Sequence, residues 1–366
     1  MTFSSLPKIG KDNGVMTPVQ PKSPFFLAPM EAVNCASFRL LCKRRGAALV
    51  YTDMIDADKF KEYADAHGGA DTPQGAQAAI DHYINPQDGR ANGTDTTKNE
   101  YLNEYPLVIQ LGGANIPNLL YTIKHVEPIA TIIDLNIGCP LPYMLAKKGG
   151  VYLSKHPDQL KKVISAMRAA ITKIPFTVKI RAGWDEDSIN AVEVAQLLES
   201  LGVDAVGIHA RTRAQGYRDR ADWQLARKIK EAIKIPLILS GDVTNVYMAY
   251  MGFAHTKCDY IMVARGAQNN PSVFTHLNEW YKTADKKDIP LQPQTTYDKN
   301  AADALADFSE FLKLYKTQEK RYRLSELKDH ALWTARECQH AANVKQAIIN
   351  AKDAMELLAI ISELEF

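Results

Sequence analysis

The stretch Ile132-Ile133-Asp134-Leu135-Asn136-Ile137-Gly138-Cys139-Pro140 says most about how this chain folds. Its first residues are β-branched and apolar, as in a strand buried on both faces, and it ends in a Gly-Cys-Pro turn. In folds that alternate strands with helices, active sites collect where the parallel strands end. The stretch therefore predicts a thiol at the mouth of a parallel sheet, and Cys139 is the first candidate for chemistry.

Short apolar runs of the same kind recur along the chain. The eight predicted strands are 25–28, 49–51, 107–111, 132–135, 176–180, 205–209, 237–240 and 260–263. Amphipathic segments typical of helices lie between them, at Pro157 to Ile171, Ser188 to Leu201 and Trp223 to Ile233. Strand followed by helix, eight times over, predicts an α/β fold, the (β/α)8 TIM barrel. An open doubly wound sheet is the alternative, but such a sheet gathers its ligands near one switch point, whereas polar residues follow every strand here.

Two segments depart from this alternation of strands and helices. Residues 61–105 are rich in Gly, Asp, Thr and Asn and predict a surface insertion, partly helical near 75–83. Residues 282–300 carry Pro, Lys and Asp with little apolar content and predict a linker. We therefore expect an N-terminal extension at 1–24, a barrel at 25–281, the linker at 282–300, and a bundle of about three or four helices at 301–366.

Composition narrows the class of protein. The chain has 366 residues, of which 46% are hydrophobic, so it can bury a large core and exceeds the usual size of one domain. Its formal net charge of +2 neither requires nor excludes a nucleic-acid partner. The N-terminus lacks the apolar core of a signal peptide, and no stretch approaches the roughly 20 apolar residues of a membrane span. We expect no membrane attachment.

The five cysteines are odd in number and form no Cys-x-x-Cys pair. This argues against a disulfide framework and a zinc site and favours a reducing cytoplasm. We interpret Cys35, Cys42, Cys258 and Cys338 as inert, buried small hydrophobes. Asn136, Lys179 and His209 would support proton transfer from Cys139, which sets it apart from the other four. A protease-like Cys/His hydrolase is the alternative, although no third hydrogen-bonded partner is evident.

Polar or cationic side chains end three further predicted strands. In Val178-Lys179-Ile180-Arg181 alternate positions point the same way, so Lys179 and Arg181 cannot both face the apolar outer layer. His209 and Arg211 end the next strand, and Gln110 ends the third. Any one of them alone would be read as a solvated loop residue. Together they predict an anionic or electron-rich ligand at the mouth.

Small residues end the last two strands, in Ser240-Gly241-Asp242 and Ala264-Arg265-Gly266. Their backbone N–H groups can approach a phosphate, Arg265 adds charge, and a helix starting near Pro271 would aim its positive end inward. Tight turns explain the glycines but not the arginine beside them. We expect a cofactor phosphate at this place.

Taken in order, these motifs resemble those of the tRNA dihydrouridine synthases, from about Phe25 to Leu277. The motifs that carry the resemblance are Ala28-Pro29-Met30, Tyr51-Thr52-Asp53-Met54, Gln110, the stretch 134–140, Val178-Lys179-Ile180-Arg181, His209-Ala210-Arg211-Thr212, Ser240-Gly241-Asp242 and Ala264-Arg265. The resemblance implies an FMN-containing barrel with a C-terminal helical domain, which reduces the C5–C6 double bond of particular uridines in tRNA with NADPH as electron donor.

The resemblance also implies roles for residues. Cys139 would be the general acid that protonates uracil C5 after FMN delivers hydride to C6. Pro29 and Met30 would pack by the isoalloxazine, Gln110 and Lys179 would bond its pyrimidine edge, and His209 would lie near it. The phosphate would lie at Ser240, Gly241, Asp242, Ala264 and Arg265, and the uracil would be held by Asn136, Arg181 and Arg211. No metal is implied, and the target base must leave its stack to reach the site.

Three motifs depart from the family pattern. Its usual Asn-Gly-Asp, Gly-Arg and Glu-Met appear here as Ser240-Gly241-Asp242, Ala264-Arg265 and Asp53-Met54. Backbone contacts to a phosphate survive the first two changes, so FMN remains the expected cofactor.

The tail carries a local excess of cations, which predicts phosphate contacts with tRNA. The residues are Lys313, Lys316, Lys320, Arg321, Arg323 and Lys328, with Tyr315 and Tyr322, in one predicted helical stretch. The alternative is a solvated helix face balanced by Glu319, Glu326 and Asp329. We expect a monomer that binds tRNA.

Two other functions stay open at this point. A flavin barrel that acts on a free small molecule, such as a dihydroorotate or enoate oxidoreductase, is disfavoured by the basic tail. A non-catalytic RNA-binding barrel is disfavoured because Cys139, Lys179 and His209 are all present.

Overall fold

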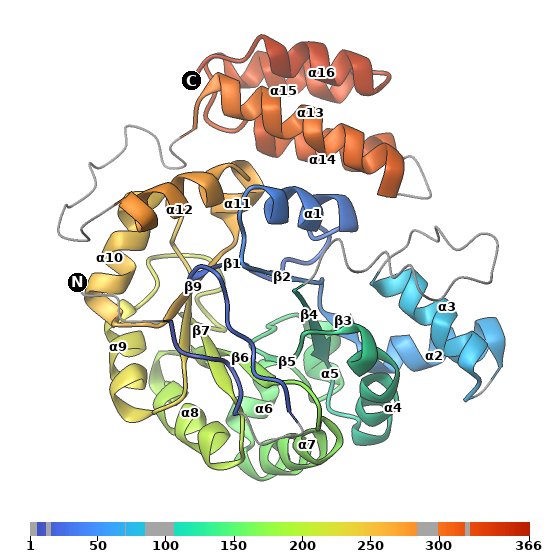
Figure 1. Ribbon diagram of the computed structural model, residues 1–366, viewed down its shortest axis with the longest axis vertical. Coiled ribbons are helices and arrows are strands. Elements are labelled where there is room, and N and C mark those ends of the chain that lie inside the picture. The colour runs from blue at the N-terminus through green and yellow to red at the C-terminus, as the bar shows by residue number, and fades with distance from the viewer. Residues whose placement is uncertain (1–5, 12–15, 70, 85–105, 284–298, 319–322) are drawn as a thin grey trace.

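The structure is a computed structural model that describes residues 6–11, 16–69, 71–84, 106–283, 299–318 and 323–366. Eight parallel strands close into a barrel, ringed by helices, with a helical tail beside it (Figure 1). The barrel strands are β1 (Phe25–Leu27), β2 (Leu49–Tyr51), β4 (Leu107–Gly112), β5 (Ile132–Ile137), β6 (Phe176–Gly183), β7 (Ala205–Thr212), β8 (Leu237–Ser240) and β9 (Tyr260–Val263). The eight predicted strands and the barrel fold are confirmed.

Closure is visible in the strand pairing. The order runs β2-β1-β9-β8-β7-β6-β5-β4, and β2 also pairs with β4, with Val50 opposite Leu107. A two-residue strand, β3 (Ile55–Asp56), extends the pairing at β4. Every strand pair is parallel, so the carboxyl ends of all eight strands open on one side.

The barrel helices pack their apolar faces on the sheet. They are α1 (Ala36–Arg44), α2 (Ala57–Gly68), α3 (Pro73–Tyr83), α4 (Ile116–Val126), α7 (Pro157–Ala170), α8 (Ala191–Ser200), α9 (Trp223–Ala232), α10 (Val246–Thr256) and α12 (Val273–Thr283), with short α5 (Pro142–Ala146), α6 (Val151–Lys155) and α11 (Arg265–Asn269). Helix α9 shows why these segments are helical. The Asp222 carboxylate caps its first turn by accepting from the N–H groups of Gln224 and Leu225, and buried Leu225 and Ile229 share one face.

The N-terminal segment closes the amino end of the barrel. Ile9 bridges to Val19 and is fully buried against the barrel interior, where Leu49, Ile132 and Ala205 begin their strands. The segment crosses the barrel end in Figure 1. This leaves the carboxyl side as the mouth of the barrel.

The predicted insertion is partly a helix pair. Helix α3 contains the predicted helix at 75–83, and it packs on α2, which begins before the predicted insertion. Thr72 caps α3, and Pro73 occupies its first turn, as helix N-termini favour. Residues 85–105 lie outside the described residues.

The described residues of the tail form four helices, α13 (Ala301–Gln318), α14 (Leu324–Thr334), α15 (Ala341–Asn350) and α16 (Ala354–Ser362). It lies on the side of the barrel formed by α1 and α11 (Figure 1). The prediction that the tail cations share one helical stretch is wrong, because α13 ends at Gln318 and α14 begins at Leu324. Within the described part of the chain, no helix is both long and apolar enough to cross a membrane.

Candidate active site

Strand register brings the predicted residues into neighbouring positions at the mouth. Gln110 on β4 pairs with Asp134 on β5, and Asn136 on β5 pairs with Lys179 on β6. Further round the barrel, Arg181 pairs with His209, and His209 pairs with Ser240. Residues spread over more than a hundred positions of sequence therefore line one rim.

Cys139 lies in the turn directly after β5 and is 7% exposed. Its carbonyl oxygen accepts a hydrogen bond from the Val151 N–H at 3.1 Å, which joins this turn to the start of α6. Burial raises the pKa of the Cys139 thiol; the Glu31 carboxylate adds to that rise, and Arg181 and Lys179 oppose it. The net effect holds the proton on sulfur at neutral pH, as a general acid requires.

A chain of hydrogen bonds fixes the amide groups beside Cys139. The Asp134 carboxylate accepts from Gln110 Nε2 at 2.7 Å and from Thr177 Oγ1 at 2.6 Å. Asn136 Nδ2 donates to Gln110 Oε1 at 2.9 Å, and Asn136 Oδ1 accepts from the Gly138 N–H at 2.9 Å. Because each bond dictates which end of the next amide is donor and which is acceptor, the Gln110 and Asn136 amides have defined orientations.

Asp134 holds this network together, and the sequence interpretation did not single it out. It is 1% exposed, and burial raises the pKa of its carboxyl to about 6. The signal that could have found it is a carboxylate in the middle of an apolar strand, where an ionisable group needs partners.

Two cations project from β6 beside Cys139. Among the residues that the structure describes, none forms a hydrogen bond or ion pair with the half-buried Lys179 ammonium. Burial and the neighbouring Arg181 charge lower the pKa of Lys179 to about 8. Arg181 donates to the carbonyl oxygens of Gly138 and Gly216, both at 2.9 Å, so it braces the Cys139 turn.

His209 is held neutral. Burial lowers its pKa well below the usual value, and the charges of Lys179, Arg181, Arg211 and Arg265 add to this effect. Arg211 donates toward His209 Nε2 at 3.0 Å, so the imidazole accepts at Nε2 and carries its hydrogen on Nδ1.

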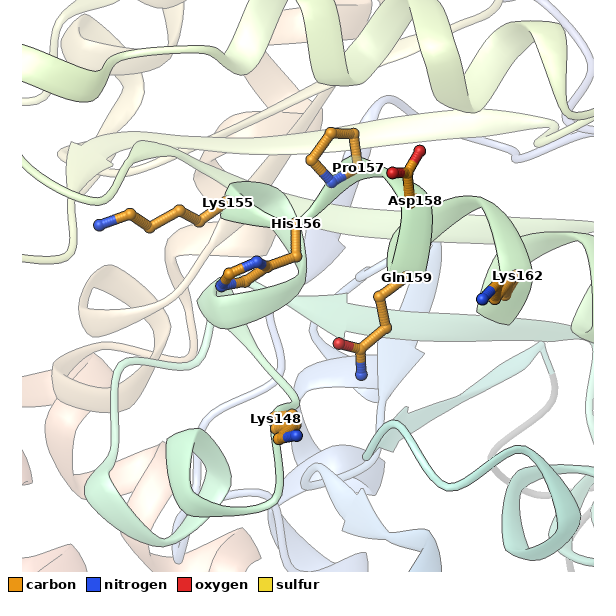
Figure 2. A pocket seen from close by; sticks show the side chains of 7 residues that line it. All are labelled: Lys148, Lys155, His156, Pro157, Asp158, Gln159 and Lys162. Carbon is orange, nitrogen blue, oxygen red and sulfur yellow. The ribbon is translucent and has the colours of Figure 1, made fainter.

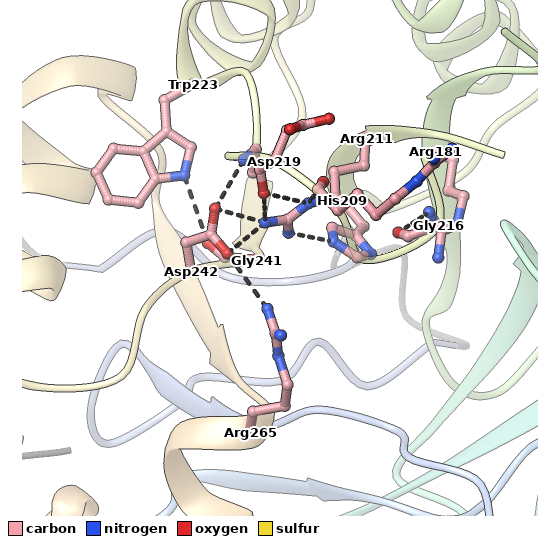
Figure 3. Close-up of polar contacts among 11 residues, drawn as sticks. Arg181, His209, Arg211, Gly216, Asp219, Trp223, Gly241, Asp242 and Arg265 are labelled. Atoms are coloured by element: carbon pink, nitrogen blue, oxygen red, sulfur yellow. Dashed lines mark hydrogen bonds and ion pairs between the residues drawn. The ribbon is translucent and has the colours of Figure 1, made fainter. Parts of the chain in front are cut away.

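Arg211 lies between His209 and Asp242 (Figure 3). It is 2% exposed and donates to both Asp242 oxygens, at 2.7 and 2.9 Å, and to the carbonyls of Arg218 and Asp219. A guanidinium engaged in this way has little capacity left for a ligand. The geometry favours a positioning role for Arg211 in place of the predicted uracil contact.

The turn predicted to hold phosphate lies across the mouth from Cys139. Gly241 has φ +106°, and a Cβ there would lie 2.9 Å from His209 Cδ2, so only glycine fits. Arg265 is 43% exposed at the side chain, and its guanidinium lies 3.4 Å from Asp242 Oδ1 (Figure 3). The predicted helix start near Pro271 is confirmed, because α12 begins at Val273, and the short helix α11 precedes it from Arg265.

The ends of β1 and β2 are tied together behind Pro29 and Met30. Asn34 Nδ2 donates to the carbonyls of Ala28 and Tyr51, each at 2.8 Å. The Asp53 carboxylate accepts from the Ala32 and Asn34 N–H groups at 3.2 Å. Pro29 and Met30 are therefore held at the rim, each half-buried.

Tyr217 is a second residue that the sequence interpretation missed. Its ring is 68% exposed, and it lies 5.7 Å from the Arg181 guanidinium and 5.6 Å from that of Arg265. An exposed ring flanked by two cations at an active-site mouth offers a stacking surface for a planar ligand. A tyrosine in a surface loop gives no such signal in the sequence.

A cleft of about 1280 Å³ runs from the rim near Glu31 and Tyr143, past α2 and α3, to α14. It connects the barrel mouth to the tail. Arg323 lines it, but its guanidinium pairs with Glu326 at 2.9 Å. Tyr315, predicted to lie among the tail cations, is buried and donates to Glu326 at 2.6 Å.

The tail cations therefore differ in their availability. Lys313 and Lys316 are exposed on α13, while Lys328 donates to the Ile349 carbonyl at 2.6 Å. Lys320, Arg321 and Tyr322 lie outside the described residues. Throughout the described ranges, no cluster of three or more His, Cys, Asp or Glu side chains could hold a metal ion.

A closed barrel with a buried thiol, a buried imidazole and an ammonium that no described residue pairs, all at the carboxyl ends of its strands, has the arrangement of a (β/α)8-barrel enzyme. The family model for dihydrouridine synthase (Dus) matches residues 80–364. A probable tRNA-dihydrouridine synthase of Rickettsia conorii is 33% identical over 74% of this chain and 74% of that protein. The tRNA-dihydrouridine synthase B of Shewanella oneidensis is 30% identical, covering 74% of this chain and 75% of the relative. The chain belongs to the dihydrouridine synthase family.

Among solved structures, 2-naphthoyl-CoA reductase in complex with 2-naphthoyl-CoA resembles this chain with a TM-score of 0.50 at 12% identity. The likeness covers 71% of this chain and 50% of the reductase. It concerns the fold alone.

Proposed function

We propose that this protein is an FMN-dependent tRNA-dihydrouridine synthase that reduces the C5–C6 double bond of uridine with NADPH as electron donor. The observation that carries the proposal is the half-buried Lys179 ammonium, which no described residue pairs. It lies close enough to Cys139 for each group to act on the pKa of the other. A cation without a protein partner at a barrel mouth favours an anionic ligand, and a protonated thiol beside it supplies an acid.

The mouth fits a flavin mononucleotide. Lys179 and Gln110 would bond the pyrimidine edge of the ring system, where negative charge accumulates on reduction, and Pro29 and Met30 would pack beside it. His209 would present its Nδ1 hydrogen. The turn at Ser240, Gly241 and Asp242 would hold the phosphate together with Ala264 and the exposed Arg265 guanidinium. When bound, reduced FMN would supply the hydride to uracil C6.

The proton would come from Cys139. Its Sγ–H bond breaks as C5 takes the proton, and the thiolate regains a proton from solvent. Asn136 would hold the uracil in an orientation fixed by its bonds to Gln110 and Gly138, and Arg181 would contact the base or its ribose while bracing the Cys139 turn. We assign Arg211 to positioning His209 and Asp242, and Tyr217 to stacking at the mouth.

The target uridine would leave its stack in the tRNA to enter the mouth, as in other enzymes that modify bases. The exposed Lys313 and Lys316 of the tail would contact phosphates of the bound tRNA. We expect the protein to act as a monomer. Its five free cysteines suit the reducing cytoplasm in which NADPH and tRNA meet.

The test is reduction of an unmodified tRNA transcript by the purified full-length chain with FMN and NADPH. We expect a yellow protein and uridines that gain two hydrogens, detected by mass spectrometry of the digested RNA. NADH in a parallel reaction defines the donor. A protein that binds no FMN would disprove the proposal. So would a flavoprotein that reduces free pyrimidines or enoates but leaves tRNA unchanged.

A further inference from the structure

A basic depression of about 510 Å³ lies on the connection between β5 and α7 (Figure 2). Its walls carry three exposed lysines, Lys148, Lys155 and Lys162, against one carboxylate, Asp158. His156 and Gln159 complete its polar lining. In Figure 2 the Gln159 side chain points toward Lys148, while Asp158 points away from it. The depression is thus positive on the side where Lys148 lies.

The depression adjoins the turn that carries the candidate acid. Lys148 precedes the Gly149-Gly150 turn, and a Cβ on Gly150 would lie 2.4 Å from the Cys139 carbonyl oxygen. The connection follows β5 and therefore opens on the carboxyl side of the barrel. Helices α6 and α7 lie across the barrel from the tail in Figure 1. The mouth is consequently flanked by the tail on one side and by this depression on the other.

The three lysines have no acidic partner among the described residues. In the part of the chain that the structure describes, no carboxylate lies within ion-pair distance of Lys148, Lys155 or Lys162. The adjacent Lys147 differs, because it pairs with Asp56 at 2.7 Å and Asp58 at 3.3 Å. The positive rim also continues beyond the depression. The Lys155 ammonium lies 5.0 Å from the centre of the Trp184 ring, on which Arg213 also packs at 4.1 Å.

We propose that this basic depression binds backbone phosphates of the tRNA substrate, on the side of the mouth opposite the helical tail. The inference rests on the proposed function, since it assumes that tRNA is the substrate. Exposed lysines spread around a shallow depression suit the repeated charges of an RNA backbone, because each ammonium can meet a separate phosphate. Contacts on both sides of the mouth would hold the tRNA while one uridine enters it.

The test compares two triple variants of the full-length holoenzyme in binding a fluorescent, unmodified tRNA transcript. The first replaces Lys148, Lys155 and Lys162 with glutamine. The control makes the same change at Lys173, Lys234 and Lys257, which are exposed and precede β6, β8 and β9 at the opposite end of the barrel. Lys257 has φ +58° and Lys148 has φ +57°, so the two sets also match in backbone conformation at one position.

In the first variant we expect the Kd for tRNA to rise at least about tenfold at physiological salt, and the slope of log K against log salt to flatten by about two units, since each RNA phosphate contact contributes roughly 0.7 to 0.9. The control should behave like the wild type. Replacing the same three lysines with arginine should restore binding, which separates lost charge from misfolding. FMN content and NADPH oxidation should stay unchanged in all variants.

An unchanged affinity and salt slope in the first variant would overturn the inference, as would an equal loss in both variants, because net charge alone would then explain it. Failure of the proposed function looks different. In that case the wild-type protein itself would form no dihydrouridine in the transcript.

Discussion

For single residues, the proposed reaction depends on which side chains carry a proton before the substrate binds. Burial and Glu31 keep the Cys139 thiol protonated, whereas burial and nearby cations keep His209 neutral. Burial also lowers the pKa of Lys179 to about 8. Because this value lies only slightly above neutral pH, Lys179 is charged at pH 7 but loses its charge on a modest rise in pH.

Replacing Cys139 with alanine should leave FMN bound and reducible by NADPH but lower dihydrouridine formation by about 10² to 10⁴ fold, because the acid is needed only when C5 is protonated. Single-turnover assays on tRNA measure this. Cys338→Ala makes the same change at a buried cysteine of the tail and should keep near wild-type activity. Near-normal turnover in the Cys139 variant would show that another group delivers the proton.

FMN affinity should depend on pH through Lys179. Its ammonium is charged below about pH 8, so affinity should be steady there and fall as pH rises further, by up to tenfold per unit until the bound state also loses its proton. Titrations of flavin fluorescence between pH 6 and 10 measure this. Lys179→Met should bind FMN more weakly at pH 7 and show no break near pH 8. Profiles of the same shape for both proteins would contradict the assignment.

At the scale of elements, the turn between α5 and α6 packs directly against the Cys139 turn. Gly150 occupies the left-handed region at φ +58°, directly against the Cys139 backbone. Gly216, in the loop after β7, has nearly the same φ of +60° but nothing within 4 Å of the position of a Cβ. The two glycines therefore share a positive φ and differ in what a Cβ would meet.

Alanine at either glycine should cost roughly 1–3 kcal/mol for the positive φ alone. Gly150→Ala should cost more, because its Cβ displaces the Cys139 turn, and dihydrouridine formation should fall on the order of 10² fold from misplacement of the thiol. Gly216→Ala should keep more activity than Gly150→Ala, because its Cβ displaces nothing and its carbonyl can still accept from Arg181. Denaturant unfolding and single-turnover kinetics of both variants check this, and equal activity losses would show that contact with Cys139 is not the cause.

At the scale of the whole molecule, the tail is part of the packing of the barrel. Helix α1 buries seven consecutive residues, because one face lies on the sheet and the other contacts α13. Asp307 of α13 is 2% exposed and accepts from Arg45 and from the Ser272 N–H and hydroxyl, the last two at 2.9 Å. Burial raises the pKa of Asp307 although Arg45 opposes the rise, so the ion pair offsets only part of the desolvation cost.

Asp307→Ala should lower the free energy of unfolding by roughly 2–4 kcal/mol, because it leaves the donors of Arg45 and Ser272 without their acceptor. Glu310→Ala removes the neighbouring pair with Arg44, whose side chain is 57% exposed, and should cost about 0–1 kcal/mol. Denaturant unfolding of the two variants measures the difference. Equal losses of stability would mean that the buried Asp307 contacts stabilise the packing of the tail no more than the exposed Glu310 pair does.

Local patterns in the chain were enough to predict the eight strands, the barrel and the strand-end positions of Cys139, Lys179, Arg181 and His209. These follow from local properties, since apolar runs of strand length and turn residues act within a few positions of each other. The resemblance to dihydrouridine synthases added the cofactor and substrate, which no spacing in the chain specifies.

The packing of distant segments determines which polar groups contact each other and which already have a hydrogen-bond partner within the protein. The bonds from Asp134 through Gln110 to Asn136 join two strands and depend on their register. Arg211 is engaged by Asp242, far along the chain, and Tyr315 is buried against Glu326 across a helix break. A sequence pattern gives the side on which a residue projects, but its partner depends on how distant segments pack, and so does whether a charge stays free for a ligand.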